Sequence, residues 1–176
     1  MSLMHVLGIA MGCAMLAGCG ATPPDGSADH HAVQVSSPGR ATCLTTTPGQ
    51  NHHGAMSTNA VREGAGLPPV RPDPVLAQVA ARHACDMATR GRMTHRGGST
   101  AGPGPRVKAA GYAPSVTAEN IAAGPFSQGR VLAEWNASGG HRANMLIPQV
   151  RDYGIGQAIG PDGRTRFWAA VYAAPR

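Results

Sequence analysis

The sequence predicts an α+β fold, a three-layer α/β/α sandwich in which a small antiparallel sheet lies between helices. Three observations predict it: the segment from Pro74 to Arg90 has helical periodicity, a second helical segment spans 128–137, and the C-terminal part has the pattern of a β-hairpin. A length of 176 residues suits one domain of ordinary size plus an appendage.

The N-terminal residues have the pattern of a lipoprotein export signal. Residues 3–18 are apolar and small, and the run is too short to span a membrane. The lipobox-like sequence Leu16-Ala17-Gly18-Cys19 predicts residues 1–18 as a signal peptide and Cys19 as the lipidated residue. We therefore expect an extracytoplasmic protein, either lipid-anchored in the cell envelope (outer membrane or periplasm in a diderm cell) or secreted. An uncleaved apolar tail is the alternative.

Residues 19–53 are predicted to be a flexible tether and residues 54–176 the folded domain. The tether is rich in Pro, Ser, Thr, Gly and Ala and has little apolar periodicity. It contains the pairs His30-His31 and His52-His53. Two interpretations of these pairs stay open: capture of a metal ion, or incidental solvated side chains.

The four cysteines divide into two groups. Cys13 lies in the signal and Cys19 is the anchor, so Cys43 and Cys85 remain as an even pair in an oxidising compartment. This predicts a Cys43–Cys85 disulfide. The rival interpretation is a Cys–His nucleophile, which is disfavoured because nothing near Cys85 in its helix would lower the pKa of the thiol.

The longest predicted helix, 74–90, begins after the N-cap Asp73 and ends at Gly91. Its apolar stripe includes His83, which we interpret as a buried packing residue rather than a ligand. The other predicted elements are helical segments at 57–63, 106–110, 128–137 and 142–146 and strands at 153–159 and 165–173.

Several blocks of residues, taken in order, carry a family resemblance. They are Thr94-His95, Ala118-Glu119-Asn120-Ile121-Ala122, Trp135, Ser138-Gly139-Gly140-His141-Arg142-Ala143-Asn144-Met145-Leu146 and Gly154-Ile155-Gly156. Their order resembles the compact bacterial branch of the CAP superfamily, the SCP-domain proteins related to cysteine-rich secretory proteins, antigen 5 and plant pathogenesis-related 1. The resemblance covers about residues 56–174 and implies the same α/β/α sandwich.

The resemblance also implies a cleft in which Glu119 lies between His95 and His141. The family's second cleft glutamate corresponds to Ser138 here, and Glu134 should point elsewhere on its helix. Two imidazoles with a carboxylate suit a weakly bound zinc ion, with His95 and His141 as ligands and Glu119 as a ligand or a residue that supports them. The sequence has no His-Glu-x-x-His motif, and it indicates no other cofactor.

Three further interpretations of the same residues stay open. Glu119 could be the general base for a metal-bound water in a peptidase-like hydrolase. Ser138 and His141 could form a dyad, although Ser138-Gly139-Gly140 fits a helix end and turn better. Alternatively, the histidines and Glu119 form a hydrogen-bonded network that ties loops to the core. Trp135 and Trp168 are expected to stabilise the core by packing.

The function that the sequence favours is non-enzymatic binding by a monomer, with a metal ion, a lipid or an envelope or extracellular partner in the cleft. The alternatives are a metal-dependent hydrolase using the same cleft and a structural envelope protein whose cleft is vestigial. Nucleic acid is not an expected partner. The net charge is +6, but the arginines are scattered, with no cluster and no interleaved aromatic residues.

Overall fold

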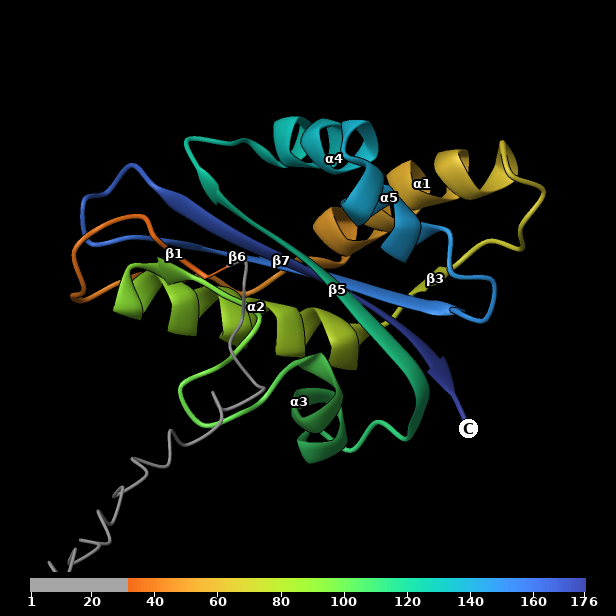
Figure 1. Ribbon diagram of the computed structural model, residues 1–176, viewed down its shortest axis with the longest axis horizontal. Coiled ribbons are helices and arrows are strands. Elements are labelled where there is room, and N and C mark those ends of the chain that lie inside the picture. Colours follow the sequence, from red (N-terminus) through yellow and green to blue (C-terminus); the bar gives the residue numbers. More distant parts are fainter. Residues whose placement is uncertain (1–31) are drawn as a thin grey trace, which may run out of the picture.

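A computed structural model describes residues 32–176, which fold around a five-stranded sheet (Figure 1). The predicted signal peptide, the lipidation of Cys19 and the pair His30-His31 lie outside the described residues. Among residues 32–176, no helix has both the length and the apolar character needed to cross a membrane.

Helices and strands are interspersed along the chain. The helices are α1 (Pro48–Glu63), α2 (Pro74–Arg90), α3 (Pro103–Ala109), α4 (Gln128–Ala137) and α5 (Gly139–Met145). The strands are β1 (Val33–Gln34), β2 (Thr42–Cys43), β3 (Arg71–Pro72), β4 (Arg92–Met93), β5 (Pro114–Gly124), β6 (Asp152–Ile159) and β7 (Arg166–Pro175). The large sheet has the antiparallel order β2-β6-β7-β5, and β3 pairs in parallel with β6; β1 and β4 form a separate antiparallel pair.

Helices cover both faces of the large sheet, so the predicted α/β/α sandwich is confirmed (Figure 1). Helices α2 and α3 pack on one face, and α1, α4 and α5 pack on the other. Strand β7 shows the arrangement clearly because alternate residues of a strand point to opposite faces. Ala169 and Val171 pack toward α2, whereas Trp168 and Tyr172 pack toward α1, α4 and α5.

Helix α2 has the predicted bounds and both predicted caps. The Asp73 side chain accepts a hydrogen bond from the Leu76 amide at 2.8 Å, and Gly91 has a φ of 62°, a left-handed conformation that favours glycine. Two glycines of β6 let this helix lie directly on the sheet. A Cβ atom on Gly154 or Gly156 would lie 2.1 Å from backbone atoms of α2. These glycines therefore permit the backbones of α2 and β6 to approach each other closely.

The domain takes in part of the segment that was predicted to be a tether. Residues 33–34 and 42–43 form strands, and α1 begins at Pro48 rather than at residue 57. The missed signal is a capping box: the Thr47 side chain accepts from the Gln50 amide, and the Gln50 side chain accepts from the Thr47 amide. Pro48 follows in the first turn, where proline is tolerated.

The predicted disulfide is present. Cys43 of β2 is joined to Cys85 of α2, with a Cα–Cα distance of 5.1 Å. The bond ties the segment before α1 to the helix that covers the sheet, across 42 positions of sequence.

Helix α4 has its predicted bounds, and α3 and α5 each begin three residues earlier than predicted, at Pro103 and Gly139. The hairpin β6–β7 matches its prediction to within two residues. Strand β5 was not predicted, because polar residues point from it toward both faces of the sheet and interrupt the apolar alternation that identifies a strand.

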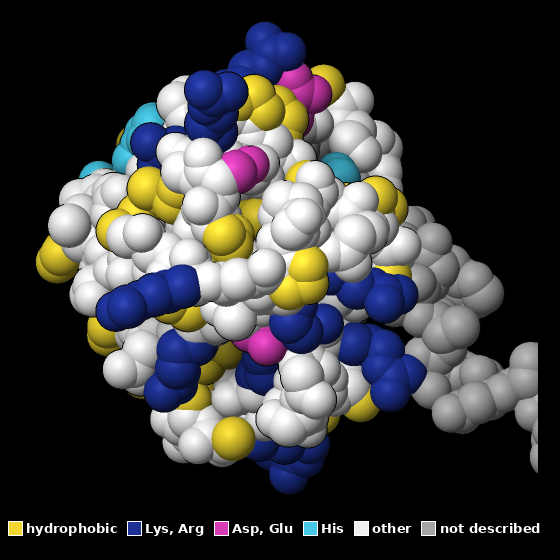
Figure 2. All heavy atoms as spheres, turned by 90° about the vertical axis from the view of Figure 1, so that its left-hand side faces the viewer, with side chains coloured by type: hydrophobic (Ala, Val, Ile, Leu, Met, Phe, Trp, Pro, Cys, Tyr) yellow, Lys and Arg dark blue, Asp and Glu magenta, His cyan; other side chains and the backbone are white. Residues whose placement is uncertain are grey.

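The surface carries the positive charge of the chain in dispersed form. On the face shown in Figure 2, Lys and Arg side chains are spread among acidic and uncharged groups. Several arginines have local partners, such as Arg130 with Glu134 and Arg90 with Asp86. Exposed pairs such as Arg130–Glu134 contribute little to stability.

Candidate functional site

The centre of the candidate site is Glu119, in the middle of β5. Its side chain is only 1% exposed. It points toward α2 and α3, because its ladder partner Val171 packs on that face. The next residue, Asn120, points the other way, toward α5.

Both carboxylate oxygens of Glu119 are occupied. His95 Nδ1 donates to Oε1 at 3.0 Å, and His83 Nε2 lies 3.6 Å from the same oxygen. Arg106 Nη2 donates to Oε2 at 2.5 Å, and Arg106 Nη1 donates to the His95 carbonyl oxygen at 2.9 Å. Arg106, from α3, therefore holds both Glu119 and the loop that carries His95. We call Glu119, His83, His95 and Arg106 the Glu119 cluster.

The charges of this cluster balance. Burial acts to raise the pKa of Glu119, but the hydrogen bond from His95, the electrostatic interactions with His83 and Arg106 and the hydrogen bond from Arg106 outweigh it, so this pKa lies below its ordinary value. Burial lowers the pKa of His83, although Glu119 acts in the opposite direction. His83 is therefore neutral at neutral pH, and its Nε2–H donates to the Thr94 carbonyl oxygen at 2.9 Å. Arg106 is the permanent cation that balances the carboxylate.

Two members of the cluster were missed as functional residues in the sequence. The predicted burial of His83 is confirmed, at 1% exposure, but its ring also faces the carboxylate. Arg106 had been counted among the scattered arginines. The signal in the sequence that could have identified Arg106 was Glu119 itself. A glutamate between apolar segments needs a cation, and that requirement makes every nearby arginine a candidate partner.

His141 lies on α5 and is connected to Glu119 through the backbone of β5. Asn120 Nδ2 donates to the His141 carbonyl oxygen at 3.1 Å, and Asn144 Nδ2 donates to the Glu119 carbonyl oxygen at 3.1 Å. The His141 ring is tilted against Trp135, with 6.4 Å between ring centroids. Beside the carboxylate of Glu119 itself lie His95 and His83.

The remaining predicted positions have structural roles. Ser138 lies at the junction of α4 and α5, as its interpretation as a helix end predicts. Glu134 points away from the cluster and pairs with Arg130 at 2.6 Å. Trp135 and Trp168 are 1% and 2% exposed and belong to the core, as predicted.

The cluster meets part of what a zinc site needs. A carboxylate that accepts from one imidazole nitrogen commonly orients the other toward a metal ion, and His95, with a side chain 31% exposed, has this arrangement. Glu119 itself is poorly placed to bind a metal, because it is buried and both of its oxygens already accept hydrogen bonds. Within residues 32–176, no group of three or more His, Cys, Asp or Glu side chains is placed to hold an ion. These residues fit a weak site with imidazole ligands and water, not a tightly held ion.

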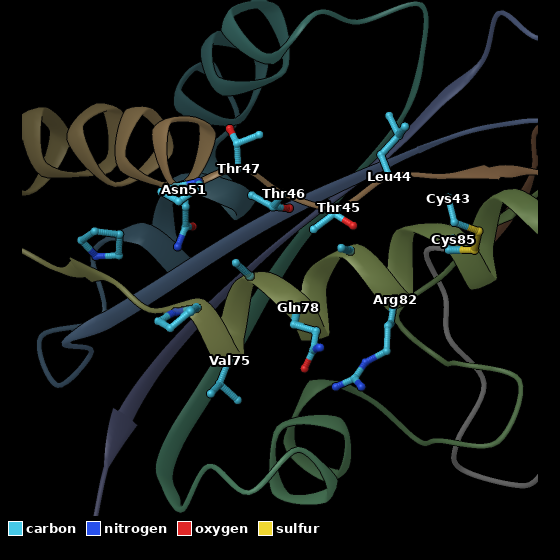
Figure 3. A pocket seen from close by; sticks show the side chains of 15 residues that line it. Cys43, Leu44, Thr45, Thr46, Thr47, Asn51, Val75, Gln78, Arg82 and Cys85 are labelled. Atoms are coloured by element: carbon cyan, nitrogen blue, oxygen red, sulfur yellow. A yellow bond between two sulfur atoms is a disulfide. The ribbon is translucent and has the colours of Figure 1, made fainter.

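Two hollows border α2. The smaller, of about 440 Å³, adjoins the cluster and is lined in part by His83, Arg106 and residues 97–100. The larger, of about 920 Å³, lies between α2 and the segment 43–48 (Figure 3). Its wall consists mainly of Pro, Ala, Val and Leu side chains and the disulfide, and Arg82 is the one charged residue among the described residues that line it.

Comparisons with known proteins agree with this architecture. The model of CAP, the cysteine-rich secretory protein family, matches residues 57–172. The uncharacterized protein YkwD of Bacillus subtilis is 32% identical over 99 residues, which cover 56% of this chain and 38% of that protein.

Two solved structures have a similar fold. An extracellular protein containing an SCP domain from Bacillus anthracis has 26% identity and a TM-score of 0.63 over 73% of this chain and 44% of its own. An outer surface protein from Borrelia burgdorferi has 17% identity and a TM-score of 0.65, over 78% of this chain and 99% of its own. The chain thus spans less than half the length of the two Bacillus proteins.

Proposed function

Since the chain belongs to the cysteine-rich secretory protein (CAP) family, we propose that it is an extracytoplasmic, non-enzymatic binding protein whose ligand site is centred on His95. The location is supported by the export signal predicted at its N-terminus and by relatives described as extracellular or outer-surface proteins. Cys19 is its lipid anchor under this proposal.

The observation that carries the proposal is the enclosure of Glu119. A general base must reach a substrate or a water molecule with a free oxygen. Glu119 is 1% exposed, and both of its oxygens accept hydrogen bonds from side chains. It therefore orients His95, and His95 is the member of the cluster that presents its ring to a ligand. This argues against the metal-dependent hydrolase.

A weakly held zinc ion is the ligand that we favour. His95 and His141 would hold it across the free edge of β5, the edge strand that separates their two faces, and the ion would supply an electrophilic centre for a further ligand. The orientation of His95 by a buried carboxylate supports this choice.

A lipid is the second candidate, and the 920 Å³ hollow beside α2 supports it (Figure 3). Pockets of about 300–1,000 Å³ with mainly apolar walls suit drug-sized apolar ligands.

Zinc titration by calorimetry on the full chain tests the favoured ligand. The parent carries Ala at His30, His31, His52 and His53, so that these histidines cannot contribute. We expect weak binding in the parent and none after His95→Ala/His141→Ala. Equal binding by both proteins would overturn the metal proposal and leave the histidines as a structural network.

Two assays separate the remaining alternatives. Turnover of peptide substrates that is lost in Glu119→Gln but kept in Ser138→Ala would favour the hydrolase over binding. Mass spectrometry of the purified chain would reveal a co-purifying lipid. If neither metal, lipid nor turnover is found in a folded chain, a structural envelope role is the remaining function.

A further inference from the structure

Helix α1 carries an exposed group of possible metal ligands far from the Glu119 cluster in sequence. His52 and His53, assigned to a tether from the sequence, lie within this helix and are exposed. Met56 is 54% exposed, one of three large apolar side chains that remain exposed in the described part of the chain. This exposed methionine follows His53 by three residues and His52 by four, the spacings at which side chains of a helix are neighbours.

The helix brings these three side chains to one place. Successive residues of an α-helix are about 100° apart, so Met56 lies about 40° from His52 and about 60° from His53, between the two rings. A helical methionine also extends back over the turn that precedes it. The Met56 thioether therefore overlies the turn from which both imidazoles emerge.

The surroundings leave this group open to a cation. The neighbouring exposed positions Gly49 and Ala60 are small, so they do not crowd the three side chains. The one basic residue of α1, Arg62, is fully buried and donates to main-chain carbonyl oxygens, including those of Pro68 and Met145. No positive charge thus stands on the exposed side of this helix, in a chain whose net charge is +6.

We propose that His52, His53 and Met56 form a surface site for a soft monovalent cation, copper(I). Thioether sulfur selects copper(I) over zinc, and imidazole is a good ligand for copper in either oxidation state. Two nitrogens and one sulfur from a single helical turn give a three-coordinate site that is accessible to solvent. The site does not include His95, so its test is independent of the test of the proposed zinc site.

Methionine-methyl NMR of the full chain, titrated with copper(I) buffered by bicinchoninate under ascorbate, tests the proposal. This measurement resolves each methionine, so ligands elsewhere in the chain do not obscure the result; Met56→Leu assigns the signal. We expect the Met56 methyl to shift with copper(I) and not with zinc. In His52→Ala/His53→Ala the midpoint should move to a free copper(I) concentration about 100-fold higher, because each ligand after the first binds intramolecularly.

His95→Ala is the matched control, since it removes an imidazole from the other site and should leave the Met56 midpoint unchanged. Helical circular dichroism of each variant establishes that α1 is intact. The proposal is overturned if the Met56 methyl does not move, if zinc moves it equally, or if its midpoint is the same in the double histidine variant.

Discussion

The two faces of the sheet are packed by different means. On the face toward α1, α4 and α5 the largest buried side chains are aromatic, and Tyr153 and Tyr172 meet edge to face with 5.4 Å between ring centroids. On the face toward α2 the sheet contributes mainly small residues, and glycines let the helix backbone touch β6. The Glu119 cluster lies on this second face, beside α2 and α3.

The difference shows how one sheet can support a rigid core and an enclosed charge. Aromatic side chains fill volume on the first face, so its stability depends on apolar area. On the second face α2 lies so close to β6 that most of the side chains between them are small, with Phe167 as the one fully buried aromatic of that cluster, and stability depends on fit and on paired polar groups. The candidate site is built on the face where two helices can supply a histidine and an arginine to one carboxylate.

Trp168→Ala should have the largest effect on stability. It removes a buried side chain of the aromatic face and the hydrogen bond from its indole to the Phe126 carbonyl oxygen. We expect the free energy of unfolding to fall by about 4 kcal/mol. Urea denaturation measures it, with Trp168→Phe as the milder control. A loss below that of Gly156→Ala would contradict the assignment of volume filling to this face.

Glu119→Gln should have the next largest effect, about 3 kcal/mol, because it leaves Arg106 buried beside a neutral group. The double variant Glu119→Gln/Arg106→Met should regain part of the loss, since the uncompensated charge is then gone. Denaturation of the wild type, both single variants and the double variant gives the coupling energy. Additive losses would show that the pair acts independently.

Gly156→Ala should cost about 2 kcal/mol, because the new methyl group meets the α2 backbone at Ala81. Gly129→Ala in α4 is the matched control: nothing lies within 4 Å of its added Cβ, and alanine is the better helix former. The control should be neutral or stabilising by about 0.5 kcal/mol. Equal melting temperatures for the two variants would remove the argument for close packing on this face.

The smallest expected effect is a pH dependence from His83. Its pKa is lowered in the folded state, so the unfolded chain binds the extra proton first as pH falls below about 6.5. The contribution of His83 to the free energy of unfolding should therefore be constant above that pH and decline below it. In His83→Gln the slope of the free energy of unfolding against pH should be shallower between pH values of about 5 and 6.5. An unchanged slope would show that His83 is protonated equally in both states.

The loss from Glu119 follows at lower pH. Its folded pKa is also lowered, so its stabilising effect is complete above its unfolded value of about 4.3 and disappears as pH falls through the folded value. The two groups therefore destabilise the α2 face in succession on acidification.

The sequence was sufficient where the signals are local. Helix α2 could be bounded in advance because its caps, Asp73 and Gly91, act on residues only a few positions away. The bounds of α4 and the strands of the hairpin followed from periodicity in the same manner. The start of α1 was missed although its signal is equally local, because the composition of residues 48–53 hid the capping box of Thr47 and Gln50.

The partners of Glu119 required the tertiary structure. A glutamate between apolar segments has to be paired, which follows from the sequence by itself, and the family resemblance identified His95 as one partner. It did not identify His83 or Arg106, which are 36 and 13 positions away and reach Glu119 only because α2 and α3 pack on the same face of β5. The strand alternation that turns Glu119 toward those helices also turns Asn120 toward His141, and no pattern along the chain records which face receives which helix.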